Sequence, residues 1–435
     1  MTWILQVVFV VVVAIPIYFL IRRIKQIRSN ILLGKDLDRS DKPGDRWKAM
    51  FLIAFGQKKM FKKPIPAFLH LLIYVGFLVI NLEVLEFMID GLLGTHRIFA
   101  PYLGSFYNVA MNFFEFLALG VLISCVAFLI RRNVIKVPRF TKPEMKGWPA
   151  MDGNLILIIE IVLMFAILKM NAADQVLQSR GVAGYVDTGS LMISSLFIPL
   201  FQNYSDGFLV VIERGAWWFH IIGIFAFAVY VTYSKHLHIF LAFPNTYYSN
   251  LEPKGKIQNM DAVTTEVKSM LGMPVEGAGE PPAEVGTFGA KDATDLSWKS
   301  LMEAYSCTEC GRCTSECPAN QTGKTLSPRK VMMDTRDRLE DIGAGKGEGK
   351  TLLGDFITKE EINACTSCNA CTEACPINID PLSIILEMKR YVAMEESGSP
   401  ASWNSMFSNI ETNFAPWKFS PTDRFNWAQD LNDKN

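Results

Sequence analysis

Eight of the nine cysteines in this chain lie in two short runs of closely similar spacing. The first run is Cys307, Cys310, Cys313 and Cys317, and the second is Cys365, Cys368, Cys371 and Cys375. In each run two residues separate the first three cysteines, three residues precede the fourth, and a proline follows it. Such spacing lets three thiolates bind one cubane [4Fe-4S] cluster while the fourth cysteine reaches a second cluster. The two runs therefore predict two clusters that exchange their fourth ligands.

This exchange assigns every cysteine of the two runs to one cluster. The first cluster takes Cys307, Cys310, Cys313 and Cys375, and the second takes Cys365, Cys368, Cys371 and Cys317. Structural zinc and disulfide bonds are the alternatives. Zinc commonly binds two separated pairs of cysteines, and disulfides are rare in the cytoplasm, where the charge pattern described below places this domain. Cys125 stands alone in an apolar stretch and is expected to be a packing residue.

Histidines are the second group that could bind a cofactor. His70 lies inside an apolar run, and His220 and His238 are eighteen residues apart near the last long apolar stretch. On one continuous helix, this spacing puts them on the same face, roughly 27 Å apart, with His236 on the opposite face. His70 and His238 then share one depth on antiparallel helices, an arrangement suited to binding a b-type haem iron from both sides. The alternative is that these histidines only extend to the membrane surface.

Carboxylates inside apolar stretches are the third group. They are Glu83, Glu86, Glu115 and Glu160. An ionised carboxylate is costly in a membrane, so each must be protonated, paired or directed at a cavity. Lys169 and Arg214 are candidate partners. A quinone needs a proton donor or acceptor beside its carbonyl oxygen, so one carboxylate is a candidate for a quinone site, with structural pairing as the alternative.

The elements that must position these residues are mostly membrane helices. Hydrophobic residues make up 50% of the chain and charged residues only 20%, whereas about a quarter is usual in soluble proteins. Five apolar stretches approach the roughly 20 residues that a transmembrane helix needs. They run approximately over residues 3–21, 66–88, 109–130, 155–170 and 216–233. The 43 basic and 43 acidic residues balance, which gives no support for nucleic-acid binding.

Basic residues predict the orientation of these helices. Thirteen Lys and Arg lie between Arg22 and Lys63, and six lie between Arg131 and Lys146, whereas the other two loops carry far fewer. Positive loops stay on the cytoplasmic side. We therefore expect a multi-pass protein of the bacterial cytoplasmic (inner) membrane, with its N-terminus outside and its cysteine domain in the cytoplasm.

The sequence thus predicts an all-α protein, in which a five-helix transmembrane bundle precedes a helical two-cluster [4Fe-4S] ferredoxin-type domain. The expected parts are the membrane domain 1–245, a linker 246–295 containing Pro281-Pro282, the cluster domain 296–394 and an aromatic tail 395–435. A solvated linker is normally poor in aromatic residues. We therefore expect the tail to dock a partner, and the alternative is that it covers the chain's own cluster domain.

The combination of these motifs resembles heterodisulfide reductase-like membrane iron–sulfur proteins. Five spans with His220 and His238 on the last one are similar to the cytochrome b (gamma) subunit of respiratory nitrate reductase. The segment Tyr233-Ser-Lys-His-Leu-His238 resembles the membrane subunit of heterodisulfide reductase, and the cysteine domain resembles its iron–sulfur subunit. The tail segment Asn413-Phe-Ala-Pro-Trp417 resembles the sequence that precedes a cysteine-rich CCG domain in fused homologues.

Two departures from the family pattern limit what the resemblance implies. Nitrate reductase-like cytochromes carry a second histidine ten residues after the one that matches His70, and Ile80 stands there in this chain. A second, outer haem at His220 thus lacks its usual ligand, and Met88 is a candidate replacement. No CCG motif follows Trp417, so the resemblance implies a separate cytoplasmic CCG-type redox subunit as partner.

The predicted function is electron transfer between a cytoplasmic iron–sulfur or cysteine-rich partner and membrane quinone. Two [4Fe-4S] clusters and one inner haem b would carry the electrons, and the chain would be the electron-transfer subunit of a heterodisulfide reductase-like quinone oxidoreductase. One alternative is a non-redox membrane anchor that recruits a partner. The other is a conduit to an extracytoplasmic acceptor through an outer haem at His220.

Overall fold

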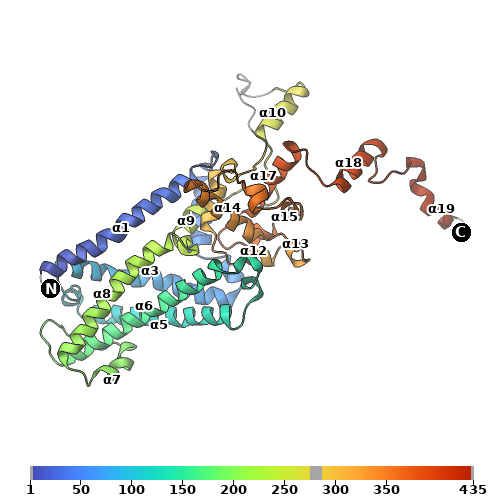
Figure 1. The fold of residues 1–435 in the computed structure, drawn as a ribbon. Coiled ribbons are helices and arrows are strands. Elements are labelled where there is room, and N and C mark those ends of the chain that lie inside the picture. Colours follow the sequence, from blue (N-terminus) through green and yellow to red (C-terminus); the bar gives the residue numbers. More distant parts are fainter. Residues whose placement is uncertain (1–2, 275–286, 433–435) are drawn as a thin grey trace.

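A computed structural model describes residues 3–274 and 287–432 of the chain (Figure 1). Five helices are long and apolar enough to cross a membrane. They are α1 (Trp3–Ile31), α3 (Pro64–Leu93), α5 (Ser105–Asn133), α6 (Trp148–Ser179) and α8 (Asp206–Val231). Each contains one of the predicted apolar stretches, except that the last stretch runs two residues past the end of α8, and the described residues form no strand, which confirms the all-α fold. The Pro281-Pro282 pair of the predicted linker lies outside the described residues.

Local sequence explains both the limits of α3 and its close packing. Pro64 occupies the first turn, where a missing backbone N–H costs nothing. Gly94 ends the helix in a left-handed conformation (φ 73°) and donates its N–H to the Asp90 carbonyl. A side chain at Gly91 would overlap the ring of Phe9 in α1, and one at Gly76 would come within 2.6 Å of Val121 in α5. Small residues thus bring three membrane helices close together.

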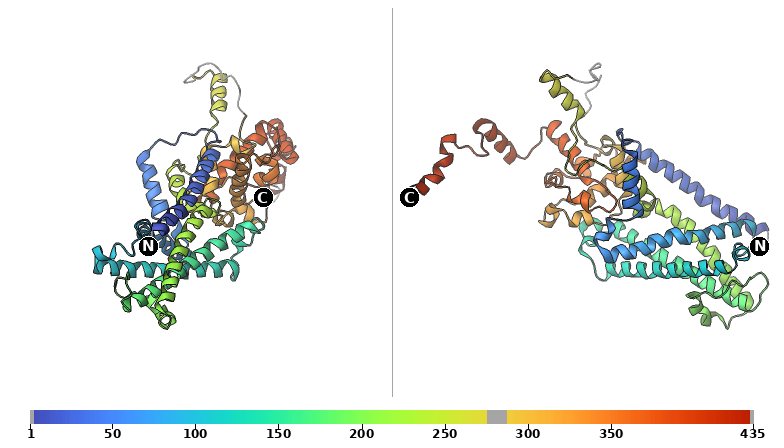
Figure 2. Two further views of the ribbon diagram at one scale, coloured as in Figure 1. Left: turned by 60° about the vertical axis from the view of Figure 1, so that its left-hand side comes forward. Right: turned by 180° about the vertical axis from the view of Figure 1, so that it is seen from behind.

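The cluster domain is a set of helices and loops at one end of the bundle (Figures 1 and 2). Its helices are α11 (Trp298–Ser306), α12 (Arg312–Ser315), α13 (Pro318–Gln321), α14 (Pro328–Gly343), α15 (Lys359–Asn363), α16 (Ala370–Ala374) and α17 (Pro381–Met394). We call the end of the bundle that contacts this domain the inner end and the opposite end, near α7 (Ile198–Phe201), the outer end.

Helix α1 holds the cluster domain against the bundle. The Arg23 guanidinium forms two hydrogen bonds to the Glu340 carboxylate, at 2.7 and 3.0 Å. Asn30 donates to the Tyr305 hydroxyl at 2.9 Å, and Ile27 packs into the core of the cluster domain. Because charged, polar and apolar contacts all lie on one face of α1, the two domains form a continuous packed unit.

The predicted linker and tail carry helices that the sequence did not predict. Helix α10 (Asp261–Met270) lies in the linker, and α18 (Ala401–Asn413) and α19 (Asn426–Asn432) lie in the tail. Neither α10 nor α18 buries a side chain. In Figure 1 and in the right-hand view of Figure 2 the tail extends away from the cluster domain, so its described residues do not cover that domain as the alternative expects.

Candidate electron-transfer site

The structure gathers the eight cysteines of the two runs into two groups of four. One group lines a large cavity of about 410 Å³ at the inner end of the bundle: Cys307, Cys310, Cys313 and Cys375. The other lines a small neighbouring cavity: Cys317, Cys365, Cys368 and Cys371. Each group contains three cysteines of one run and the fourth of the other. This is the grouping that exchanged fourth ligands require.

Matching backbone turns present the thiols in both runs. Glu309 and Ser367, each two residues after the first cysteine of its run, have left-handed backbones with φ of 54° and 56°. Their N–H groups donate to the sulfur atoms of Cys307 and Cys365, both at 3.4 Å. Such bonds to sulfur favour thiolate ligands and tune the cluster that the thiolates bind. The Ile379 N–H donates to the sulfur of Cys375 at 3.2 Å in the same way.

Because these thiols are buried, they need a bound metal in order to lose their protons. Desolvation raises the pKa of Cys307, Cys371 and Cys375 to about 12, so their thiolates need a nearby positive charge. Bound iron supplies such a charge and displaces the proton. All nine cysteines are free of disulfides, and the described residues contain no convergent group suited to a single metal ion. The donor set therefore fits two all-thiolate clusters.

His70 and His238 face one another beside the first cysteine group. Their ring centroids are 6.4 Å apart, and both rings line the large cavity. Two imidazoles that bind one iron at roughly 2 Å each have centroids roughly 6 Å apart, by the usual metal–imidazole bond length. The spacing of the two rings is therefore one at which His70 and His238 would together hold one haem.

Hydrogen bonds orient both rings for ligation. Nδ1 of His238 lies 3.1 Å from the backbone oxygen of Lys235, and Nδ1 of His70 lies 3.2 Å from the side-chain oxygen of Gln57. These oxygens only accept hydrogen bonds, so Nδ1 carries the proton and Nε2 keeps its lone pair. Metal-binding histidines are usually held in this way.

The route by which His238 reaches this position differs from the prediction. Helix α8 ends at Val231, and a short 3-10 turn, Lys235–Leu237, precedes α9 (His238–Tyr247). His220 and His238 therefore do not share one continuous helix, and the prediction from their spacing was wrong on this point. His236 was also wrongly placed on an opposite face, because its ring lies 5.3 Å from that of His238 and lines the same cavity.

Asp152 of α6 stabilises the break after α8. Its carboxylate accepts hydrogen bonds from the Ser234 hydroxyl at 2.7 Å, from the Lys235 N–H at 3.2 Å and from the Tyr230 hydroxyl. Backbone groups freed by the end of a helix need such partners. The sequence gives no motif for this role, so Asp152 was missed.

The large cavity extends from the cysteines into the bundle, where it reaches His220 and Glu160. His220 is 1% exposed, and its Nδ1 has no hydrogen-bond partner among the described residues. Met88 does not line this cavity and packs instead beside Phe87 and Trp217. The structure therefore does not present Met88 and His220 as facing ligands in the cavity.

The predicted intramembrane carboxylates separate into two environments. Glu160 lines the cavity, whereas Glu83, Glu86 and Glu115 are buried at the outer end. The predicted partners differ as well. Arg214 pairs with its neighbour Glu213, with one contact at 2.7 Å. Lys169 is exposed and forms no ion pair within the described ranges, so its predicted pairing was wrong.

Comparison with known proteins identifies the cysteine domain. Residues 303–379 match the 4Fe-4S dicluster domain family. The chain is 27% identical to the probable iron-sulfur-binding oxidoreductase FadF of Bacillus subtilis, over 98% of this chain and 61% of that protein. It is also 27% identical to the EtfAB:quinone oxidoreductase of Syntrophomonas wolfei, over 98% and 60%. No solved structure matches the chain.

A third relative links the chain to heterodisulfide reductases. It is one of the subunits of the dihydromethanophenazine:CoB–CoM heterodisulfide reductase of Methanosarcina mazei, and it is 26% identical over 32% of this chain and 36% of its own length. The chain is thus a membrane iron–sulfur protein, and these relatives are an iron-sulfur-binding oxidoreductase, a quinone oxidoreductase and a heterodisulfide reductase subunit. The predicted resemblance to heterodisulfide reductase-like membrane iron–sulfur proteins is confirmed. The chain spans about three fifths of the length of the first two relatives.

Proposed function

We propose that this chain passes electrons between a cytoplasmic redox partner and membrane quinone, through two [4Fe-4S] clusters and one haem b at the inner end of the bundle. One observation carries this proposal: His70 and His238 face one another across the same cavity that the first cysteine group lines. When bound, the clusters and haem supply reversible one-electron redox chemistry. The protein's part is to hold them close together and to exclude water.

Arginine side chains at the inner end support the haem assignment. Arg132, Arg139, Arg312 and Arg329 all line the cavity. The Nε atoms of Arg139 and Arg329 are buried without a hydrogen-bond partner among the described residues. Haem b carries two propionate groups, and guanidinium groups bind carboxylates well. Arg329 already pairs with Glu144 at 2.6 Å, so the other three arginines are the side chains suited to receive the propionates of a haem held by His70 and His238.

The haem ligands can be tested by replacing single histidines in the purified membrane protein. In His70→Ala or His238→Ala, we expect loss of the α-band of reduced b haem, because one axial ligand is missing. His236→Ala is the matched control, since His236 lines the same cavity but its ring has no carbonyl contact among the described residues that would orient it for ligation. A full pyridine haemochrome signal in His70→Ala would contradict the assignment.

The tail supports a docking role for a cytoplasmic cysteine-rich subunit or domain. Its aromatic side chains are between 40% and 79% exposed: Trp403, Phe407, Phe414, Trp417, Phe419, Phe425 and Trp427. Aromatic residues are common anchors of protein interfaces. The two relatives that match over 98% of this chain are both longer than it is. We propose that the tail contacts the redox partner that exchanges electrons with the clusters.

Deleting residues 402–435 tests this docking role. We expect the shortened protein to keep both clusters and the haem, because the deleted helix α18 buries no side chain. A co-purifying soluble subunit and quinone-linked electron flow should be lost. If the shortened chain loses its clusters instead, the tail is a structural part of the cluster domain; if it keeps its partner, docking occurs elsewhere.

Orientation completes the proposal. The basic loops between α1 and α3 and between α5 and α6 lie at the inner end, beside the cluster domain. By the charge rule this end faces the cytoplasm. We therefore propose a bacterial inner membrane location with the N-terminus outside, and adding a reporter at each terminus of the full chain would test it.

A further inference from the structure

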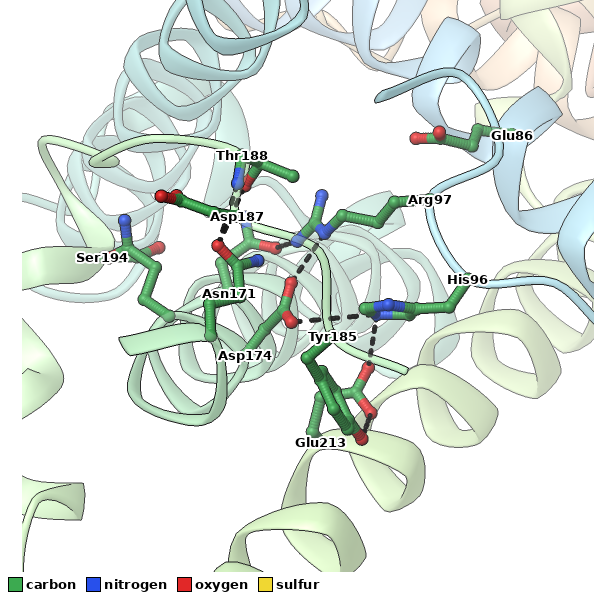
Figure 3. A network of polar contacts seen from close by, with 12 residues as sticks. Glu86, His96, Arg97, Asn171, Asp174, Tyr185, Asp187, Thr188, Ser194 and Glu213 are labelled. Carbon is green, nitrogen blue, oxygen red and sulfur yellow. Dashed lines mark hydrogen bonds and ion pairs between the residues drawn. The ribbon is translucent and has the colours of Figure 1, made fainter. Parts of the chain in front are cut away.

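Two polar side chains in the middle of the bundle lack the partners that polar side chains at its outer end have. At the outer end, Arg97 donates to Asp174 at 2.6 Å and to Asn171 at 2.7 Å (Figure 3). His220 and Glu160 both line the large cavity instead. Nδ1 of His220 has no hydrogen-bond partner, and Glu160 forms no hydrogen bond or ion pair, among the described residues. Because a polar group without a partner is costly in an apolar interior, both side chains are suited to a molecule bound in the cavity.

His220 and Glu160 lie close to the contact between α6 and α8. A side chain at Gly223 of α8 would come within 2.7 Å of Leu163 in α6, so the two helices pack closely there. Glu160 lies about one turn to the inner side of this contact, and His220 lies about one turn to its outer side. The ring of Phe87 in α3 lies 5.9 Å from that of His220, so α3 forms a third wall. The two polar residues are thus roughly 9 Å apart along the bundle, by the rise of about 1.5 Å per residue.

The cavity near these two residues is apolar and opens towards lipid. Its lining there includes Ile80, Val84, Leu163, Met164 and Ile224. Leu78 and Asn81 of α3 also line the cavity, and both are exposed at the surface of the bundle. They lie near the middle of a helix that is long and apolar enough to span the membrane, where the surroundings are hydrocarbon. A molecule that enters beside them must therefore be lipophilic.

A second haem fits this part of the cavity less well than a haem fits the inner part. A haem held from both sides needs a second ligand opposite His220, such as His, Cys, Met or Tyr. None of these types occurs among the α3 residues that line the cavity at this level, which are Phe77, Ile80, Asn81 and Val84. Met164 of α6 also lines the cavity, but it packs into an apolar cluster with Leu163 and Val121.

We propose that the middle of the cavity, between His220 and Glu160, binds the head group of the membrane quinone. This inference rests on the proposed quinone-linked function and names its site. A quinone carries two oxygens on opposite sides of one apolar ring. One oxygen forms a hydrogen bond with the His220 imidazole and the other with the Glu160 carboxyl group. The apolar tail leaves towards lipid beside Leu78 and Asn81.

The position of this site suits electron exchange with the inner end. His70, His236 and His238 line the inner part of the same cavity. A quinone between His220 and Glu160 is therefore in the same cavity as the proposed haem ligands, with no helix between the two sites. Large apolar cavities with a few convergent polar groups are the usual form of small-molecule sites, and this cavity has that form.

Binding of a fluorescent quinol analogue, 2-heptyl-4-hydroxyquinoline N-oxide, to the purified, cofactor-loaded protein tests the site. We expect the Kd of the analogue to rise about tenfold in His220→Ala and in Glu160→Ala, the effect of losing one hydrogen bond of about 1.4 kcal/mol. Glu160→Gln should restore most of the affinity, because an amide can still form the hydrogen bond. The visible spectrum of the haem and the iron content should not change in any of these variants.

Two matched controls separate the site from its surroundings. His236→Ala removes a histidine from the inner part of the same cavity. Asp206→Ala removes a carboxylate that pairs with Arg180 at the outer surface, at 2.5 Å. Both variants should bind the analogue with wild-type affinity. Weaker binding in His236→Ala, with wild-type binding in His220→Ala, would place the quinone at the inner end and overturn the proposed site.

Further outcomes distinguish failure of the site from failure of the function. If His220→Ala and Glu160→Ala both bind the analogue as the wild type does, the site lies elsewhere and the quinone-linked function stands. If the haem content falls from two to one per chain in His220→Ala, a second haem occupies the proposed site. If the wild type neither binds the analogue nor is reduced by menadiol, a soluble quinol, although dithionite reduces it, the quinone-linked function itself is wrong.

Discussion

The two ends of the transmembrane bundle use polar residues in opposite ways. At the inner end, His70, His238 and four cysteines line a common cavity, and hydrogen bonds at Nδ1 orient both histidine rings. At the outer end, Arg97 donates to Asp174 and Asn171, and these buried side chains fill the space between helices. Inner-end side chains are thus arranged for cofactors, whereas outer-end side chains are arranged for each other.

Because of this difference, we expect the inner end to determine cofactor binding and the outer end to determine the stability of the bundle. A cofactor-binding side chain at the inner end contributes little to the packing of the bundle. Replacing it should therefore remove a cofactor and leave the helices in place. A buried ion pair at the outer end holds loops and helices together, so its loss should weaken the bundle and leave the cofactors bound. Three substitutions test whether the two ends can be separated in this way.

The largest effect is expected for Cys317→Ser. Cys317 lines the small cavity with the three cysteines of the second run, although it belongs to the first. The variant should lose the second cluster and keep the first, so that non-haem iron falls from about eight to about four atoms per chain. Iron and labile sulfide analysis after anaerobic purification measures this, and stoichiometric zinc without sulfide would contradict the cluster assignment.

Arg97→Ala should have the next largest effect and should act on stability. It leaves Asp174, which is 1% exposed, without its guanidinium partner, and breaking a buried pair costs about 3–5 kcal/mol. We expect a lower thermal midpoint in detergent with unchanged haem and cluster spectra. Lys169→Ala, at an exposed position on α6, is the control and should stay within about 0.5 kcal/mol of the wild type. Loss of the haem in Arg97→Ala would show that the two ends are coupled.

A smaller effect is expected for Asp152→Ala, at the inner end. Its carboxylate holds Ser234 and Lys235 at the break after α8, and leaving buried donors without a partner costs about 1–3 kcal/mol. Because this break positions His238, the haem should remain bound with a shifted reduction potential. Redox titration of the visible spectrum measures the shift. An unchanged potential would mean that α9 is positioned by its own packing.

Much of the inner end could be predicted from the sequence because its chemistry is encoded locally. The spacing within each cysteine run defines the ligand set, and the apolar run around His70 indicates a histidine inside a span. The structure places His70 and His238 close together, as predicted, although the continuous helix from His220 to His238 was wrong. A turn after α8 brings His238 to His70 instead.

The buried polar contacts around Arg97 at the outer end could not be predicted because the residues come from distant segments without a shared motif. Arg97 lies in a loop, Tyr107 at the start of α5, and Asp174 and Glu213 near the outer ends of α6 and α8. Each alone looks like an ordinary polar residue at the end of a span. The sequence did signal Glu83, Glu86 and Glu115 by their apolar surroundings, but not the arginine and histidine between the acidic groups.

Helix α1 also has a mechanical consequence. Its 29 residues form a rod roughly 43 Å long, about 13 Å longer than a bilayer core of about 30 Å. The extra length carries Arg23, Ile27 and Asn30 to the cluster domain. The rod therefore helps to set how far the cluster domain lies beyond the apolar part of the bundle. One residue inserted before Arg23 would rotate the docking face by about 100° and misalign the two domains.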